Sequence, residues 1–137
     1  MKEFDPVIAV FRRYSPTREA IPTEETAPLQ NKLWELFKFL ERYHLPSWKL
    51  YQYIIVIINR ILTFSSKEDM VPEIASHVTK EKSIVDCVSE LYDICHASPL
   101  RLEMLWEIQK QFSGSLLCDA GEPLLVIQRV LPIKLRK

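Results

Sequence analysis

Glycine is scarce in this chain, with 2 residues among 137, and no other feature constrains the fold as strongly. Phosphate-binding loops, dinucleotide-binding fingerprints and the tight turns of many-stranded β folds need positions that only glycine fills easily. The hydrophobic fraction is 47%, and a single domain of this length buries roughly two-thirds of its unfolded surface. The sequence therefore favours one helical domain over a nucleotide-binding α/β fold or an all-β fold.

The first expected helix follows Thr26, a residue type that caps helix N-termini. Pro28 falls in its first turn, where the missing N–H costs nothing, and Pro46 ends the segment. Trp34 and Phe39 lie on another side of this helix, which gives it more apolar surface than one buried stripe requires. The apolar stripe itself has helical spacing and consists of Leu29, Leu33, Leu36, Phe37, Leu40 and Tyr43.

The second expected helix covers 48–64, with Ser47 as its cap. Its β-branched run at 54–58 fits a buried strand nearly as well. The length of the segment favours a helix. Because it is apolar almost all round, we expect it to be the central element on which the others pack.

Three more helices are expected between residue 65 and Gly114. The first begins after Ser65 or Ser66, or alternatively at Pro72. The second is introduced by Thr79, and the third by Ser98 with Pro99 at its first position. Gly114 is expected to close the last helix in the left-handed conformation. The prediction is an all-α fold: a single compact bundle of about five short helices in 28–137.

Residues 1–27 form a separate arm that contains Pro6, Pro16 and Pro22 and lacks leucine and tryptophan. We expect most of it to be flexible. Its start is more apolar than a linker requires, so it either packs back as a short strand or turn or docks on a partner as a linear motif. The residues of this possible docking segment are Phe4, Val7, Ile8 and Phe11.

The tail, 123–137, follows an expected turn at 119–121 and is apolar and then basic. It is either a solubilising end, a segment that lies on a membrane surface, or a segment that docks in a partner groove. Its candidate docking residues are Leu124, Leu125, Ile127, Leu131, Lys134 and Arg136.

Motifs for catalysis or metal binding are absent from the sequence. His44, His77 and His96 form no HExxH or HxH pattern, and no CxxC pair exists. We therefore expect no catalytic residue, no metal and no cofactor. Of the three cysteines, Cys87 and Cys95 are expected to be packed thiols. Cys118, beside Asp119 on the expected turn, is the one candidate nucleophile with predicted exposure, and it is the basis of an alternative enzyme hypothesis.

Charge and targeting signals point to an intracellular protein without a membrane span. The formal net charge is +0, so no overall field draws the chain to nucleic acid, which we do not expect as a partner. An odd number of cysteines suits a reducing compartment, the cytoplasm or the nucleus. The N-terminus lacks the apolar region of a signal peptide, and the longest uninterrupted apolar run of 48–64, at 53–58, is too short for a transmembrane helix.

Aromatic residues exceed what single apolar stripes hide, and this surplus is the main functional signal. Exposed tryptophan and tyrosine are enriched where proteins bind proteins. We expect a non-enzymatic interaction module, an adaptor or accessory protein, that binds partner proteins or a second copy of itself. The alternatives are a dense aromatic core and a peripheral membrane protein that uses the tail. The expected partner-binding residues are Trp34, Phe39, Trp48, Tyr51 and Trp106.

The layout resembles that of the small C accessory proteins of paramyxoviruses: a proline-containing arm, then several short amphipathic helices with few glycines. The resemblance implies an accessory protein that antagonises host interferon signalling by binding host proteins. No signature residue carries the resemblance, and the net charge of +0 departs from the basic arms common in that family.

Overall fold

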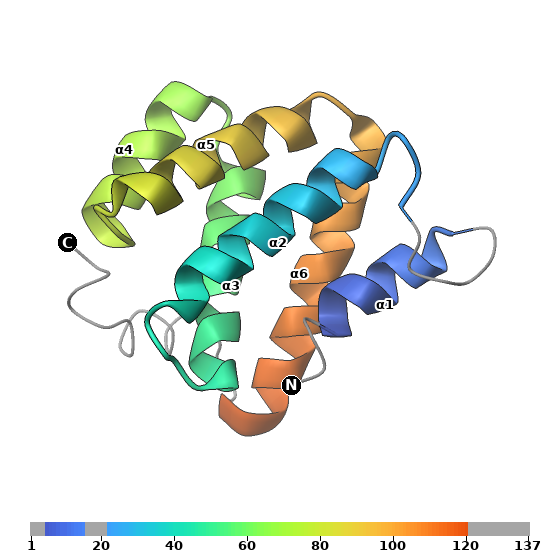
Figure 1. Cartoon of the computed structure of the whole chain (residues 1–137), viewed down its shortest axis with the longest axis horizontal. Helices are drawn as coiled ribbons and strands as arrows, with labels where there is room; N and C mark the ends of the chain where they lie inside the picture. The colour runs from blue at the N-terminus through green and yellow to red at the C-terminus, as the bar shows by residue number, and fades with distance from the viewer. Residues whose placement is uncertain (1–4, 16–21, 121–137) are drawn as a thin grey trace.

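The computed structural model describes residues 5–15 and 22–120 (Figure 1). These residues form six α-helices and no strand, which confirms the all-α prediction. Helix is also the outcome for 54–58, which fitted a buried strand nearly as well. The helices are α1 (Asp5–Arg13), α2 (Ala27–Glu41), α3 (Ser47–Thr63), α4 (Lys67–His77), α5 (Lys82–His96) and α6 (Pro99–Ala120).

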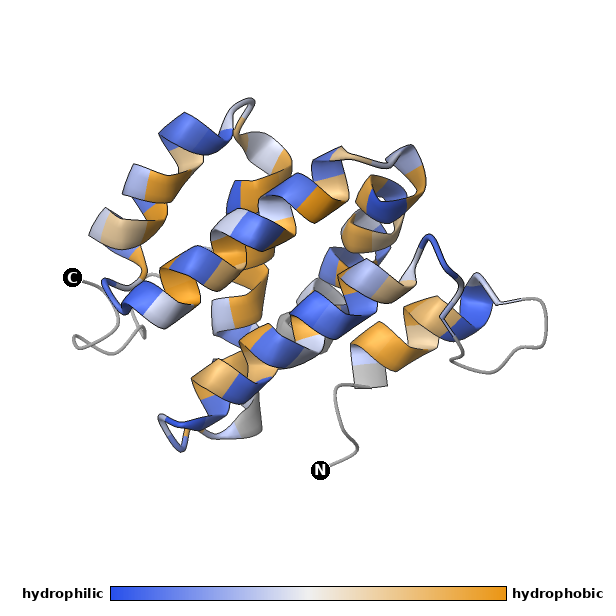
Figure 2. Ribbon diagram, turned by 45° about the horizontal axis from the view of Figure 1, so that its top comes forward, coloured by the Kyte–Doolittle hydropathy of each residue, from blue (hydrophilic) through white to orange (hydrophobic). Residues whose placement is uncertain are grey.

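Helix α3 is the centre of the bundle, as its apolar composition predicts. It packs against α2, α4, α5 and α6, and every residue from Tyr53 to Ile58 is buried. Helices α2 and α5 lie side by side and antiparallel, and α6 runs antiparallel to α3 (Figure 1). Hydrophobic residues line the facing sides of the helices and hydrophilic residues their outer sides (Figure 2).

Most helix starts follow the local signals in the sequence. Ser66 caps α4, and its hydroxyl accepts a hydrogen bond from the Asp69 N–H at 3.3 Å. The Ser98 hydroxyl accepts from the Arg101 N–H at 3.4 Å, at the start of α6. Thr26 is the N-cap residue of α2, but its hydroxyl accepts from the Thr23 N–H, outside the helix, rather than from the first turn. Side-chain capping is local, and sequence reasoning captures it.

Three predicted helix starts are shifted or wrong. The alternative start at Pro72 is wrong, because this proline lies inside α4. The helix after Thr79 begins at Lys82 with Glu81 as its N-cap, and Thr79 instead accepts the Glu81 N–H at 3.0 Å in the preceding turn. Helix α3 includes Ser47, and its N-cap residue is Pro46.

The predicted strand or turn at the start of the arm is also corrected. Residues 5–13 form helix α1, which packs on α6, with Val7, Val10 and Phe11 buried. The i, i+3 and i+4 spacing of these three residues places them on one helix face. Ile8 is partly buried, and Phe4 lies outside the described residues.

Two ionisable contacts hold the end of α1 on α6. The Arg13 guanidinium forms an ion pair with Glu107 at 2.8 Å, and the Tyr14 hydroxyl donates to the Glu103 carboxylate at 2.8 Å. Burial of the hydroxyl, the hydrogen bond to Glu103 and nearby negative charge raise the pKa of Tyr14 to about 12. The neutral, donating form of Tyr14 is therefore the form present over the whole physiological pH range.

Helix α6 extends further than the glycine in its sequence suggests. Gly114 lies inside the helix, and α6 continues to Ala120, so the predicted helix end at Gly114 is wrong. Asp119 and Ala120 are helical rather than in a turn, and Cys118 lies on the same helical backbone. The residues of the predicted tail, 123–137, lie outside the described part of the chain. Among the helices of the described residues, none combines the length and apolar character that a bilayer span requires.

Candidate functional site

The five aromatic residues of the expected binding surface differ in exposure. Trp48 and Trp106 are exposed by 46% and 45%, more than any other large hydrophobic side chain among the described residues. Trp34, Phe39 and Tyr51 are partly buried and pack against the core. Trp34, Phe39 and Tyr51 therefore fit the alternative of a dense aromatic core. Trp48 and Trp106 do not fit it, because they are exposed.

The five residues do not form one continuous patch. Trp34 and Phe39 are five positions apart on α2, which places them roughly 140° apart around the helix axis. The Tyr51 ring meets the Phe112 ring edge-on at 4.8 Å between centroids. Trp48 precedes Tyr51 by three positions on α3, and Trp106 precedes Phe112 by six positions on α6. Because α3 and α6 are antiparallel, the two tryptophans lie on opposite sides of the Tyr51–Phe112 contact, roughly 13 Å apart along the bundle.

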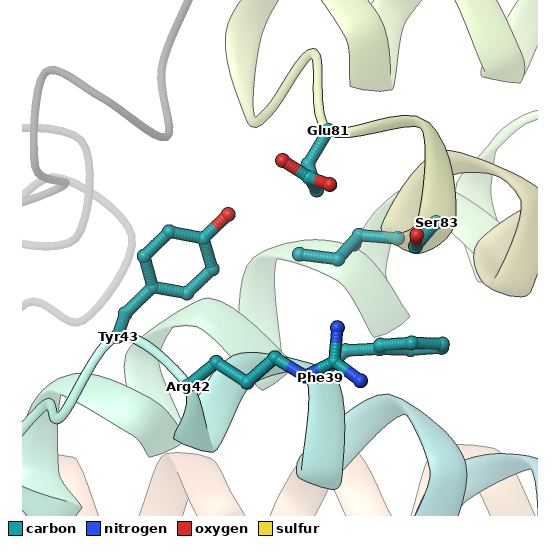
Figure 3. A pocket seen from close by; sticks show the side chains of 6 residues that line it. Phe39, Arg42, Tyr43, Glu81 and Ser83 are labelled. Atoms are coloured by element: carbon teal, nitrogen blue, oxygen red, sulfur yellow. The ribbon is translucent and has the colours of Figure 1, made fainter.

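Phe39 belongs to a pocket between the end of α2 and the start of α5 (Figure 3). The pocket has a volume of about 210 Å³. Sequence reasoning identified Phe39 alone as a candidate binding residue. Arg42 and Tyr43 follow it in the same segment, whereas the other half of the lining comes from a segment about forty residues further along the chain. Its described lining residues are Phe39, Arg42, Tyr43, Glu81, Ser83 and Ile84.

Local structure at both chain segments positions these residues. Helix α2 ends at Glu41, and the chain turns through His44, whose φ of 52° lies in the left-handed region. Histidine is one of the non-glycine types that adopt this region more often than others. On the other side, the bond from the Glu81 N–H to the Thr79 hydroxyl fixes Glu81 at the start of α5. The antiparallel packing of α2 on α5 brings the two segments together.

The rim of the pocket carries opposite charges. The Arg42 guanidinium lies 5.0 Å from the centroid of the Phe39 ring, a cation–π arrangement. The Tyr43 hydroxyl points toward Glu81 (Figure 3). Burial of this hydroxyl raises the pKa of Tyr43, and so do the charge of Glu81 and a side-chain hydrogen bond to it, while the charge of Arg42 acts in the opposite direction.

Arg42 differs from the lysines near α5 in its ion pairing. Within the described part of the chain, no carboxylate lies within ion-pair distance of its guanidinium, whereas the outer acidic residues of α5 are each matched by a lysine. The three ion pairs on α5 are Lys82–Asp86, Lys32–Glu90 and Lys67–Asp93. A cation of the pocket rim is thus left available to an external anion.

The two described cysteines are packed thiols, as expected. Cys87 and Cys95 are buried, and burial raises the pKa of each to about 12. The Cys87 thiol donates to the Lys32 carbonyl at 3.8 Å. A thiol with so high a pKa carries almost no thiolate near neutral pH, and the thiolate is the nucleophilic form.

The remaining chemical candidates are only partly visible. The residues that the structure describes contain no cluster of three or more His, Cys, Asp or Glu side chains placed to hold a metal ion. The side chain of Cys118 and the candidate docking residues of the tail lie outside the described residues, so the enzyme and membrane hypotheses stay predictions. Comparison of the chain with protein-family models, with curated proteins and with solved structures found no match.

Proposed function

We propose that this protein is a non-enzymatic interaction module that binds a partner protein through Trp48, Trp106 and the pocket at Phe39. The observation that carries the proposal is the exposure of the two tryptophans, at 46% and 45%. Tryptophan is the residue type most enriched among those that dominate binding energy at protein interfaces.

The apolar area left in water is large enough to matter. A tryptophan side chain offers up to about 250 Å², so each ring leaves on the order of 100 Å² exposed. At about 25 cal/mol per Å², covering one ring contributes roughly 2.5 kcal/mol to association. Two such rings contribute roughly 5 kcal/mol before the cost of association is subtracted. Further contacts, among them those of the pocket at the α2–α5 end, supply the rest of the binding energy in this proposal.

The test compares what the full chain captures with and without the two rings. The chain is expressed in cells, isolated by affinity capture and its associated proteins are quantified by mass spectrometry. Trp48→Ser combined with Trp106→Ser is expected to reduce the recovery of specific partners at least tenfold. Sedimentation velocity on the same proteins tests self-association.

The matched control replaces exposed residues on neighbouring surface, with Lys110→Ser on α6 and Glu41→Ser on α2. Circular dichroism verifies that every variant keeps its helix content. If the tryptophan variant recovers the same partners as the control, or if the unaltered chain recovers no partner and does not self-associate, the proposed function is wrong.

A further inference from the structure

The size of the pocket between α2 and α5 limits what it can hold. Its volume of about 210 Å³ is below the roughly 300–1,000 Å³ of pockets that bind small-molecule ligands and cofactors. A pocket of this size admits a small group rather than a whole cofactor. A single residue of a partner chain is therefore the unit to consider.

The lining combines an apolar surface with two polar sides. Phe39 and Ile84 supply the apolar surface. Figure 3 shows the Arg42 guanidinium beside the Phe39 ring and the Glu81 carboxylate across the pocket, with the Tyr43 hydroxyl turned toward Glu81. The complementary ligand has an apolar side chain, a negative group at the Arg42 side and a hydrogen-bond donor at the Glu81 side.

Arg42 is suited to a carboxylate in particular. Its planar guanidinium presents paired N–H donors that match the two oxygens of a carboxylate. Its position over the Phe39 ring holds the group at the pocket rim, and no carboxylate of the described residues pairs with it. The charge of Arg42 is therefore complementary to an incoming anion rather than matched within the fold.

We propose that this pocket binds the C-terminal residue of a partner protein, an apolar residue whose free α-carboxylate pairs with Arg42. Its backbone N–H donates to Glu81, and its side chain packs on Phe39 and Ile84. The inference rests on the proposed binding function and names the partner feature that this site recognises. A C-terminal residue carries all three groups within one residue, whereas an internal acidic residue needs a neighbouring residue to supply the apolar side chain.

The experiment uses the full chain labelled with ¹⁵N and two peptides that differ at one group. Acetyl-Ala-Ala-Leu with a free carboxylate is compared with the same peptide amidated at its C-terminus, by NMR titration of the Arg42 Nε–H and the Ser83 amide. The free acid is expected to give saturable shifts at millimolar concentration. Amidation is expected to weaken binding at least tenfold, because it removes the charge that pairs with Arg42.

Variants of one side chain connect the preference to Arg42. Arg42→Gln is expected to remove the difference between acid and amide, and Arg42→Lys to keep part of it, because lysine retains the charge without the paired donors. Lys38→Gln is the matched control, because it removes the same charge from an exposed position on α2, four residues before Arg42 and outside the pocket. This control is expected to behave as the unaltered chain.

Each alternative outcome contradicts the inference. The inference is wrong if the acid and the amide give equal shifts, if no shift saturates, or if Arg42→Gln keeps the preference for the acid. Each of these results would show that the pocket does not bind a terminal carboxylate. Tighter binding of free leucine than of the peptide would identify an amino-acid site instead. If the peptide fails while the Trp48 and Trp106 variants still lose their partners, this inference is wrong and the proposed function stands.

Discussion

At the scale of single residues, the most informative group is Tyr14 at the end of α1. Its hydroxyl donates to the Glu103 carboxylate at 2.8 Å, and its pKa of about 12 is above the ordinary value of 10.0. Because the pKa is raised in the folded state, the stability that this contact contributes is fully present below the unfolded-state pKa. It is lost as the pH rises through the folded-state value.

Attachment of α1 is therefore expected to weaken between about pH 10 and pH 12, and not at lower pH. The tyrosinate absorbance of the full chain minus that of Tyr14→Phe isolates the titration of Tyr14. Glu103→Gln is expected to lower the pKa of Tyr14 toward 10, because it removes the largest interaction with a neighbouring side chain. Glu41→Gln, an exposed change on α2, serves as the control. A Tyr14 that titrates near 10 in the unaltered chain would contradict the contact.

At the scale of helices, the helix ends show where the local sequence is enough to predict the structure. Ser66 and Ser98 cap α4 and α6 as their sequences indicate, because a capping hydroxyl needs only the first turn of its own helix. Gly114 has the sequence signature of a helix end, yet α6 continues past it. A glycine ends a helix only if the chain turns left-handed there, and the local sequence does not decide whether it does.

Gly114→Ala is expected to stabilise the protein. A Cβ at this position meets no atom within 4 Å, and alanine in a helix interior is favoured over glycine by about 0.5–1 kcal/mol. Urea denaturation of the full chain, followed by circular dichroism, measures the change in the free energy of unfolding. A left-handed glycine at a helix end would give the opposite sign, because alanine is strained there.

The pocket shows why sequence reasoning stops short of the site. Phe39 belongs to the surplus aromatic surface that the sequence predicts, whereas Glu81 and Ser83 carry no motif and resemble an ordinary helix start. Only the antiparallel packing of α2 on α5 makes them neighbours of Arg42. The apolar faces of most helices can be recognised from the local sequence, whereas this site exists only because tertiary packing brings two distant segments together.

At the scale of the whole molecule, the arm contributes a sixth helix to the bundle. Helix α1 packs against α6, and the side chain of Phe11 is 2% exposed. A nine-residue helix is too short to be stable alone in water. Tertiary burial of one face is what makes α1 helical, and the three prolines of the arm obscured this in the sequence.

Phe11→Ala is accordingly expected to destabilise the whole domain by about 3 kcal/mol, the lower end for a buried phenylalanine. Arg12→Ala, one position along and exposed, is expected to change the free energy of unfolding by less than about 0.5 kcal/mol. Urea denaturation followed by tryptophan fluorescence measures both. Identical curves for the two variants would show that α1 adds nothing to the stability of the bundle.

The central position of α3 has a consequence for biosynthesis. This helix emerges from the ribosome before α5 and α6, which later cover much of its apolar surface. At about 5–20 residues per second, translation leaves its isoleucine-rich middle unprotected for several seconds. The nascent chain thus passes through an interval in which this apolar surface is open to chaperones, and we expect slower translation of the segment after α3 to lengthen that interval.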